Sequence, residues 1–139
     1  MKRTSDLENE MSEKIQLDHF LKNNEEQFIT YDFSALLEPY LKEKHLSKAE
    51  LARRAKMSDV YLFQILSGRR QPSRDKLLCL CIGLKLDVEQ TQEFLKRCHQ
   101  VPLYVKDRRD AVLRYGIELG WGVGKINDAL FDAGEKMLG

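Results

Sequence analysis

The chain has 139 residues, of which 42% are hydrophobic and 32% charged, and this balance fits one domain, or one small domain with helical additions. It contains no apolar run long enough to span a membrane, and its start, MKRTSDLENE, lacks the apolar stretch of a secretion signal. Three prolines and eight glycines are few, which favours long helices. We therefore expect an all-α, cytoplasmic protein.

The formal net charge of +1 is spread unevenly along the chain. Residues 1–41 carry four bases and nine acids (−5), residues 42–76 carry ten bases and four acids (+6), and residues 77–139 carry nine of each. A basic block of this kind suits a phosphate-binding surface, although charge alone does not exclude a solvated basic face.

The three cysteines do not make a disulfide framework. Cys79 and Cys81 lie in the apolar run LLCLCIGL and are therefore predicted to fill the core. A metal shared by the two is not expected, because two residues spaced this way on a helix do not face one ligand. Cys98 and His99 have no second pair at zinc spacing. We expect no metal and no cofactor, and a reducing compartment such as a bacterial cytoplasm.

Two helices are predicted before the basic block. Residues 8–22 have apolar side chains at helical spacing, and this helix either packs on the domain or pairs with another chain. Asp32 is a suitable N-cap for the next helix. Pro39 either kinks that helix or lies in the first turn of a new one. The predicted inner face of the second helix consists of Phe33, Leu36, Leu37, Tyr40 and Leu41.

Two short helices separated by a turn follow. Ser47 and Glu50 form a predicted capping box that starts a helix over about 48–54, with Leu51 and Ala52 facing inward. After the turn AKM, Ser58 caps the next helix. Its predicted inner stripe is Leu62, Ile65 and Leu66, and it stops at Ser67-Gly68.

Four more helices complete the prediction. Pro72-Ser73 opens an almost wholly apolar, buried helix, and a second capping box from Asp87 to Gln90 starts a helix that ends near Cys98. Helices over about 107–119 and 124–133 follow, with Gly120 and Gly134 at their C-terminal caps. Their predicted inner faces are Ala111, Val112, Tyr115 and Leu119 in the first, and Ile126, Leu130 and Phe131 in the second. Trp121 either plugs the core or anchors a contact.

One spacing runs through the middle of the chain without gaps: Leu46-Ser47, Glu50-Leu51-Ala52, Met57-Ser58, Leu62, Ile65, Ser67-Gly68, Pro72-Ser73 and the run from Leu77 to Leu84. Residues 46–90 thereby resemble the lambda-repressor-like helix-turn-helix family, the Cro or XRE type. The resemblance implies a five-helix domain over 31–99, between an N-terminal helical arm (1–30) and a C-terminal two-helix extension (100–139). The extension is similar to those of some small bacterial regulators.

The resemblance also implies a reading surface, because the second helix of the pair lies in the major groove in this family. Carried over by position, Gln64 would pair with adenine, Val60 would touch a thymine methyl and Asp59 would accept from cytosine N4. Helical geometry independently points Val60, Gln64 and Ser67 outward. The implied phosphate contacts are Lys48, Tyr61, Ser67, Arg70 and Arg74, and the positive field is increased by Arg53, Arg54, Lys56 and Arg69.

Some residues depart from the family pattern. Lys56 and Lys85 occupy turn positions where glycine is usual. Asp59 is repulsive near phosphates, and Tyr61 and Phe63 have the character of protein-contact residues.

Two functions stay open. The first is sequence-specific binding of double-stranded DNA by a bacterial transcriptional regulator, for which a homodimer on two half-sites would increase specificity. The alternative is a protein–protein interaction module, an antitoxin-like protein or a regulatory adaptor. An enzyme is not expected, because the glycine-rich stretch 120–124 lacks a preceding strand and the lysine-serine ending of a phosphate loop.

Overall fold

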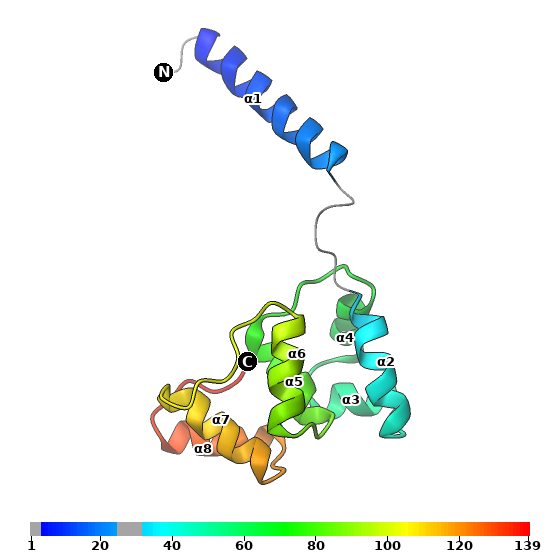
Figure 1. Cartoon of the computed structure of the whole chain (residues 1–139), viewed down its shortest axis with the longest axis vertical. Helices are drawn as coiled ribbons and strands as arrows, with labels where there is room; N and C mark the ends of the chain where they lie inside the picture. Colours follow the sequence, from blue (N-terminus) through cyan, green and yellow to red (C-terminus); the bar gives the residue numbers. More distant parts are fainter. Residues whose placement is uncertain (1–3, 25–31) are drawn as a thin grey trace. The chain divides into compact units, whose positions relative to one another are not determined.

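The computed structural model describes residues 4–24 and 32–139, with side chains from residue 8 onward. Within these residues all regular structure is α-helical, which confirms the predicted fold class (Figure 1). The chain divides into two compact units, Met1–Thr30 and Tyr31–Gly139. The helices are α1 (Thr4–Asn23), α2 (Phe33–Glu43), α3 (Lys48–Arg54), α4 (Asp59–Leu66), α5 (Arg74–Gly83), α6 (Val88–Arg97), α7 (Arg108–Glu118) and α8 (Val123–Asp132).

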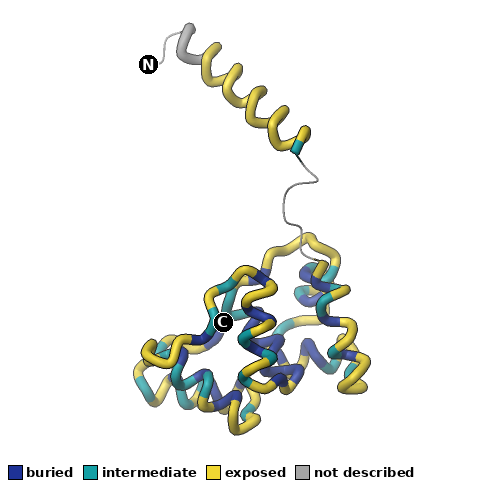
Figure 2. The backbone as a smooth tube through the Cα atoms, in the orientation of Figure 1, coloured by how far each residue is buried: buried dark blue, intermediate teal, exposed yellow. Residues whose placement is uncertain are grey.

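Helix α1 confirms the helix predicted over 8–22 and begins earlier, at Thr4. Its side chains are exposed almost throughout (Figure 2). These exposed side chains include five large apolar residues. Leu7 precedes them in the chain, and its side chain lies outside the described residues. Whether α1 packs on the domain or pairs with another chain stays a prediction. The exposed apolar residues of α1 are Met11, Ile15, Leu17, Phe20 and Leu21.

Helix α2 begins where the sequence indicates, since the Asp32 carboxylate accepts a hydrogen bond from the amide of Ala35 at 3.0 Å. The helix continues through Pro39 to Glu43, so the structure excludes a second helix starting at that proline. Leu37 and Leu41 lie on either side of Pro39 and are both buried, which anchors the two halves of α2 in one core.

Serine caps start both short helices of the middle segment. Ser47 accepts from the Glu50 amide at 3.1 Å, and Ser58 accepts from the Tyr61 amide at 3.0 Å. Only half of the capping box predicted for α3 forms, namely the hydrogen bond from the Glu50 amide to the Ser47 side chain. The Glu50 carboxylate binds Arg53 and Arg54 instead of the Ser47 amide. Lys56 occupies a turn position where glycine is usual, and as expected there its φ is positive, at 58°.

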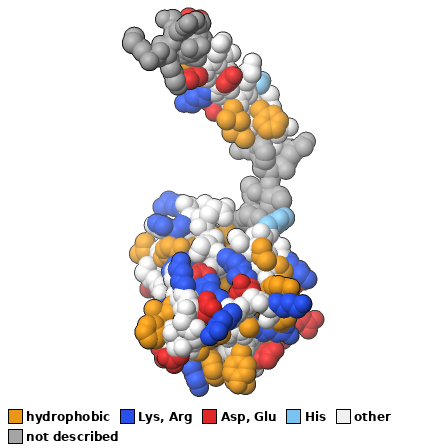
Figure 3. Space-filling view, turned by 90° about the vertical axis from the view of Figure 1, so that its left-hand side faces the viewer, with side chains coloured by type: hydrophobic (Ala, Val, Ile, Leu, Met, Phe, Trp, Pro, Cys, Tyr) orange, Lys and Arg blue, Asp and Glu red, His pale blue; other side chains and the backbone are white. Residues whose placement is uncertain are grey.

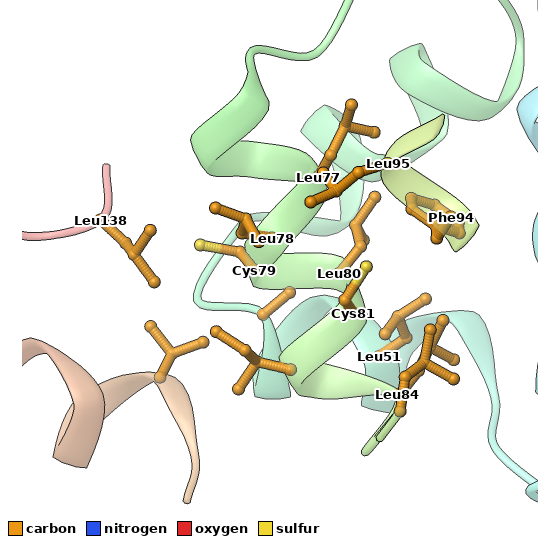
Figure 4. Close-up of a cluster of buried hydrophobic side chains, with 14 of the residues drawn as sticks. Leu51, Leu77, Leu78, Cys79, Leu80, Cys81, Leu84, Phe94, Leu95 and Leu138 are labelled. Carbon is orange, nitrogen blue, oxygen red and sulfur yellow. The ribbon is translucent and has the colours of Figure 1, made fainter. Parts of the chain in front are cut away.

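Helix α5 is the centre of the larger unit. All seven residues from Leu77 to Gly83 are buried, and they meet side chains from α3, α6 and the C-terminal segment (Figure 4). Cys79 and Cys81 extend to different sides of α5, as their spacing predicts. Gly83 has a packing role, because a Cβ atom there would lie 3.2 Å from the Ala55 amide nitrogen. The predicted capping box of α6 is complete, with Asp87 and Gln90 each accepting from the other's backbone.

The face that α7 buries differs from the prediction. Tyr115 and Leu119 are 59% and 55% exposed, whereas Leu113, Gly116 and Ile117 are buried. Packing partners decide the face, because a Cβ on Gly116 would lie 2.6 Å from Cγ1 of Ile126 on α8. No periodic pattern within α7 reports such a partner.

Helix α8 agrees with its prediction in part. Ile126 and Leu130 are buried as expected, but Phe131 is 70% exposed and Val123 is buried instead. Gly120 and Gly134 end α7 and α8 with positive φ angles of 72° and 74°, as predicted. In the part of the chain that the structure describes, no helix combines the length and apolar character needed to cross a bilayer.

Candidate nucleic-acid interface

Helix α4 turns an apolar surface outward. Leu62 and Ile65 are buried, whereas the hydrophobic side chains of Val60 and Phe63 are 65% and 61% exposed. Gln64, predicted to point outward, is only half exposed. Phe63, and not Gln64, is the exposed residue in the middle of the outer face of α4, and the exposed residues Asp59 and Ser67 lie on either side of it.

A chain reversal after α4 returns Arg70 to this helix. Gly68, with a φ of 79°, follows the C-cap, and the amides of Arg69 and Arg70 both donate to the Gln64 carbonyl, at 2.9 and 3.2 Å. The Arg70 Nε also donates to Gln64 Oε1 at 3.0 Å. Its Cζ lies 5.0 Å from the centre of the Tyr61 ring. Gln64 is half-buried because Arg70 lies against it.

Lys76, in the first turn of α5, is a member of this surface that the sequence interpretation missed. Its Nζ lies 5.3 Å from the centre of the Tyr61 ring, so two cations, Arg70 and Lys76, form cation–π contacts with one aromatic side chain. Neither forms an ion pair with an acid among the described residues. No local pattern could have identified Lys76, since its neighbour is on another helix.

A hollow of about 440 Å³ lies along the other side of α4. It brings three predicted site residues, Lys48, Asp59 and Ser67, together with Phe63. Thus the start of α3 and the outer face of α4 form one continuous surface. The remaining lining residues are Ser34, Ala49, Leu62 and Leu66.

The structure gives Arg74 partners other than the predicted phosphate. Its Nε donates to the Val101 carbonyl at 2.9 Å, and one terminal nitrogen donates to the Pro102 carbonyl at 3.2 Å. Both terminal nitrogens also bind the Asp110 carboxylate. The phosphate role of Arg74 stays a prediction, whereas in this structure Arg74 joins the C-terminal extension to α5. The reason is that the extension folds back over the start of α5.

The positive field near α3 is also partly compensated. Arg53 and Arg54 both pair with Glu50, and the hydrogen bond from Arg53 lowers the pKa of that carboxyl below its ordinary value. Lys56 and Arg69 are exposed and have no acidic partner among the described residues. Lys56 lines a separate hollow with Gly83 and Lys85. The cations available around α4 are therefore Lys48, Arg69, Arg70 and Lys76.

Residues 32–94 match the family model of a helix-turn-helix domain. This segment is a helix-turn-helix domain. The match extends from the N-cap of α2 into α6 and agrees with the Cro or XRE-type resemblance of the sequence. No curated protein and no solved structure matches the chain.

A helix-turn-helix domain suggests DNA as the partner and regulation as the role, at a coarse level. The extension, α7 and α8, lies beyond the matched residues. On the face drawn in Figure 3, basic and acidic side chains intermingle and hydrophobic atoms form separate patches. Among the described residues, no three His, Cys, Asp or Glu side chains gather in a way that could hold a metal ion.

Proposed function

We propose that this protein binds double-stranded DNA sequence-specifically as a bacterial-type transcriptional regulator, with α4 in the major groove, and acts without catalysis. One observation carries the proposal: the exposed face of α4 has, on both flanks, cations that form no ion pair with an acid among the described residues. Lys48 lies on the side of Phe63, and Arg70 and Lys76 lie on the side of Tyr61. Such an arrangement lets an α-helix enter the groove while cations on each side meet the two phosphate backbones.

The roles within the surface follow from the chemistry of each side chain. Val60 and Phe63 are exposed and apolar, and both suit thymine methyl groups. Asp59 suits the amino group of cytosine. The proposed phosphate contacts are Lys48, Tyr61, Ser67 and Arg70, and we add Lys76 to the proposal because it lies beside the Tyr61 ring. Arg69 contributes to the positive field.

Salt dependence tests the electrostatic part. Four available cations predict a slope of log affinity against log salt of about −3 to −4, because each neutralised phosphate contributes about −0.9. Lys48→Ala should weaken binding to all sequences and make this slope shallower by about 1. Lys106→Ala is the matched control, because it removes one exposed charge from the loop before α7 and should leave the slope unchanged.

Selection from random duplex DNA near physiological salt tests the sequence-specific part. An enriched motif is the expected outcome. A two-fold symmetric motif with half-sites about one helical turn apart would indicate a homodimer on DNA. Recovery of unenriched DNA that dissociates when salt is raised would contradict the proposal.

A protein-binding role is the second candidate, and the exposure of Val60 and Phe63 beside a 440 Å³ hollow favours it. A partner protein would insert an apolar side chain into this hollow, and in this role the domain would have no affinity for DNA. Tyr61 is less suited than Phe63, because it is half-buried between two cations. Phe63→Ala should then abolish capture of the partner, and a partner that still binds this variant would exclude the role.

A further inference from the structure

We propose that Arg70 determines which base Gln64 reads: by holding the side-chain oxygen of Gln64, it makes the pair a set of hydrogen-bond donors that selects guanine. The proposal rests on the proposed DNA binding and replaces the adenine contact suggested by the sequence. Arg70 is thus assigned a positioning role in addition to any contact with phosphate.

Two contacts fix the Arg70 side chain on α4. Its Nε donates to Gln64 Oε1 at 3.0 Å, and its guanidinium carbon lies 5.0 Å from the centre of the Tyr61 ring. The backbone is fixed as well, since the Gln64 carbonyl accepts from the amides of Arg69 and Arg70. The pair is therefore arranged before DNA arrives, and ordering it costs little on binding.

The hydrogen bond changes what the Gln64 amide can offer. Reading adenine through two hydrogen bonds requires the amide oxygen to accept from N6 while the amide nitrogen donates to N7. In this structure the oxygen already accepts from a guanidinium, so an incoming N6 amino group would meet a cation. The groups left for a base edge are the Nε2 hydrogens of Gln64 and the terminal N–H groups of Arg70. None of these Arg70 groups bonds to a residue that the structure describes.

Guanine is the base whose edge fits this set of donors. It presents two acceptors, N7 and O6, in the major groove, whereas adenine presents one acceptor and one donor. We therefore expect guanine at the operator position that Gln64 contacts, with cationic assistance from Arg70.

The chain supplies a matched control for the test. Arg69 precedes Arg70, carries the same charge and is exposed, but its side chain forms no hydrogen bond with Gln64. Arg69→Ala and Arg70→Ala therefore remove the same charge from nearly the same place. A difference between them in base preference reports the contact with Gln64 and not the field.

The experiment starts from the operator enriched by selection. The position at which Gln64→Ala abolishes base preference is identified, and affinities are measured for all four bases there. Wild-type protein should prefer guanine to adenine about tenfold, and 7-deazaguanine, which lacks the N7 acceptor, should cancel most of that preference. Arg70→Ala should move the preference toward adenine, because the amide oxygen becomes available. Arg69→Ala should weaken all four operators equally and keep the order of bases.

Two results would overturn the proposed role of Arg70 without overturning the proposed DNA binding. If Arg70→Ala weakens every operator to the same extent as Arg69→Ala, Arg70 is a phosphate contact, while the proposed DNA binding stands. If the side-chain amide NMR signals of Gln64 in the free protein do not shift in Arg70→Ala, the two residues are not paired. Selection without any enriched motif would overturn the proposed function and this inference with it.

Discussion

The guanidinium of Arg74 and the carboxylate of Asp110 face each other through two parallel hydrogen bonds, of 3.1 and 2.9 Å. Arg74 begins α5 of the helix-turn-helix domain, and Asp110 lies in the first turn of α7 in the extension. Their neighbours form the reciprocal pair, in which Arg109 binds Asp75 through two bonds of 2.9 Å. Together the four residues join the extension to the domain.

Asp110→Asn should destabilise the protein by about 2–4 kcal/mol, because it leaves the largely buried Arg74 charge without its counter-charge. The free energy of unfolding from urea titration measures the effect. Glu118→Gln, which breaks the exposed pair with Arg114, serves as the control and should cost less than about 1 kcal/mol. Equal costs for the two variants would show that the Arg74–Asp110 pair contributes no more than a surface pair.

Asp75 should make stability depend on acid pH. Burial raises the pKa of its carboxyl, but the hydrogen bonds and charge of Arg109 outweigh burial, and the pKa is below its ordinary value. A carboxyl with a lowered pKa stabilises the fold above its ordinary pKa of about 3.9 and loses this contribution as pH falls through the lower folded value.

Asp75→Asn should therefore cost about 1–3 kcal/mol at neutral pH, from the lost charged hydrogen bonds. It should also make the free energy of unfolding less dependent on pH below about 4 than in wild type. Urea titrations at several pH values between neutrality and pH 2 test this. Parallel curves for the two proteins would show that Asp75 carries no such dependence.

Gly116→Ala should destabilise the packing of α7 on α8. The added Cβ would lie 2.6 Å from Cγ1 of Ile126, which is fully buried, and 3.1 Å from the Trp121 ring. Overpacking of this kind costs about 1–3 kcal/mol. Gly124→Ala is the matched control in α8, because a Cβ there meets nothing within 4 Å and alanine favours a helix by up to about 1 kcal/mol. Thermal unfolding should therefore move the two melting temperatures in opposite directions.

The cysteines should react slowly in the native protein. Burial raises the pKa of Cys79 and of Cys98 to about 11, and raises that of Cys81 well above its ordinary value. Since the thiolate is the reactive form, a disulfide reagent at pH 8 should modify all three thiols only after unfolding in denaturant. Rapid modification of one thiol without denaturant would mean that the core opens around that residue.

Features that depend on neighbouring residues could be predicted from the sequence. Ser47 and Ser58 cap α3 and α4 through amides three residues ahead, and the second capping box of α6 is of the same local kind. The positive φ of Lys56 was expected from its place in the turn between α3 and α4. Such features hold because the groups that interact are close in the chain, so their geometry is set before the fold forms.

The candidate interface was predicted less completely. The sequence identified α4 as the reading helix and Val60 as an outward residue, but the half-burial of Gln64 comes from Arg70, six residues later and beyond a chain reversal. Lys76 joins the surface through the ring of Tyr61, which lies on another helix. Neither contact belongs to a helical period.

The sequence by itself determined the all-helical class, the helix-turn-helix segment, the helix caps and the burial of α5, because propensity, capping and hydrophobic spacing act over a few residues. Tertiary structure alone decided the partner of Arg74 and the face that α7 buries. Asp110 lies 36 residues from Arg74, and Gly116 faces a residue of α8. A periodic pattern shows that a helix has an inner side, but the shape and charge of the neighbouring helix select which side that is.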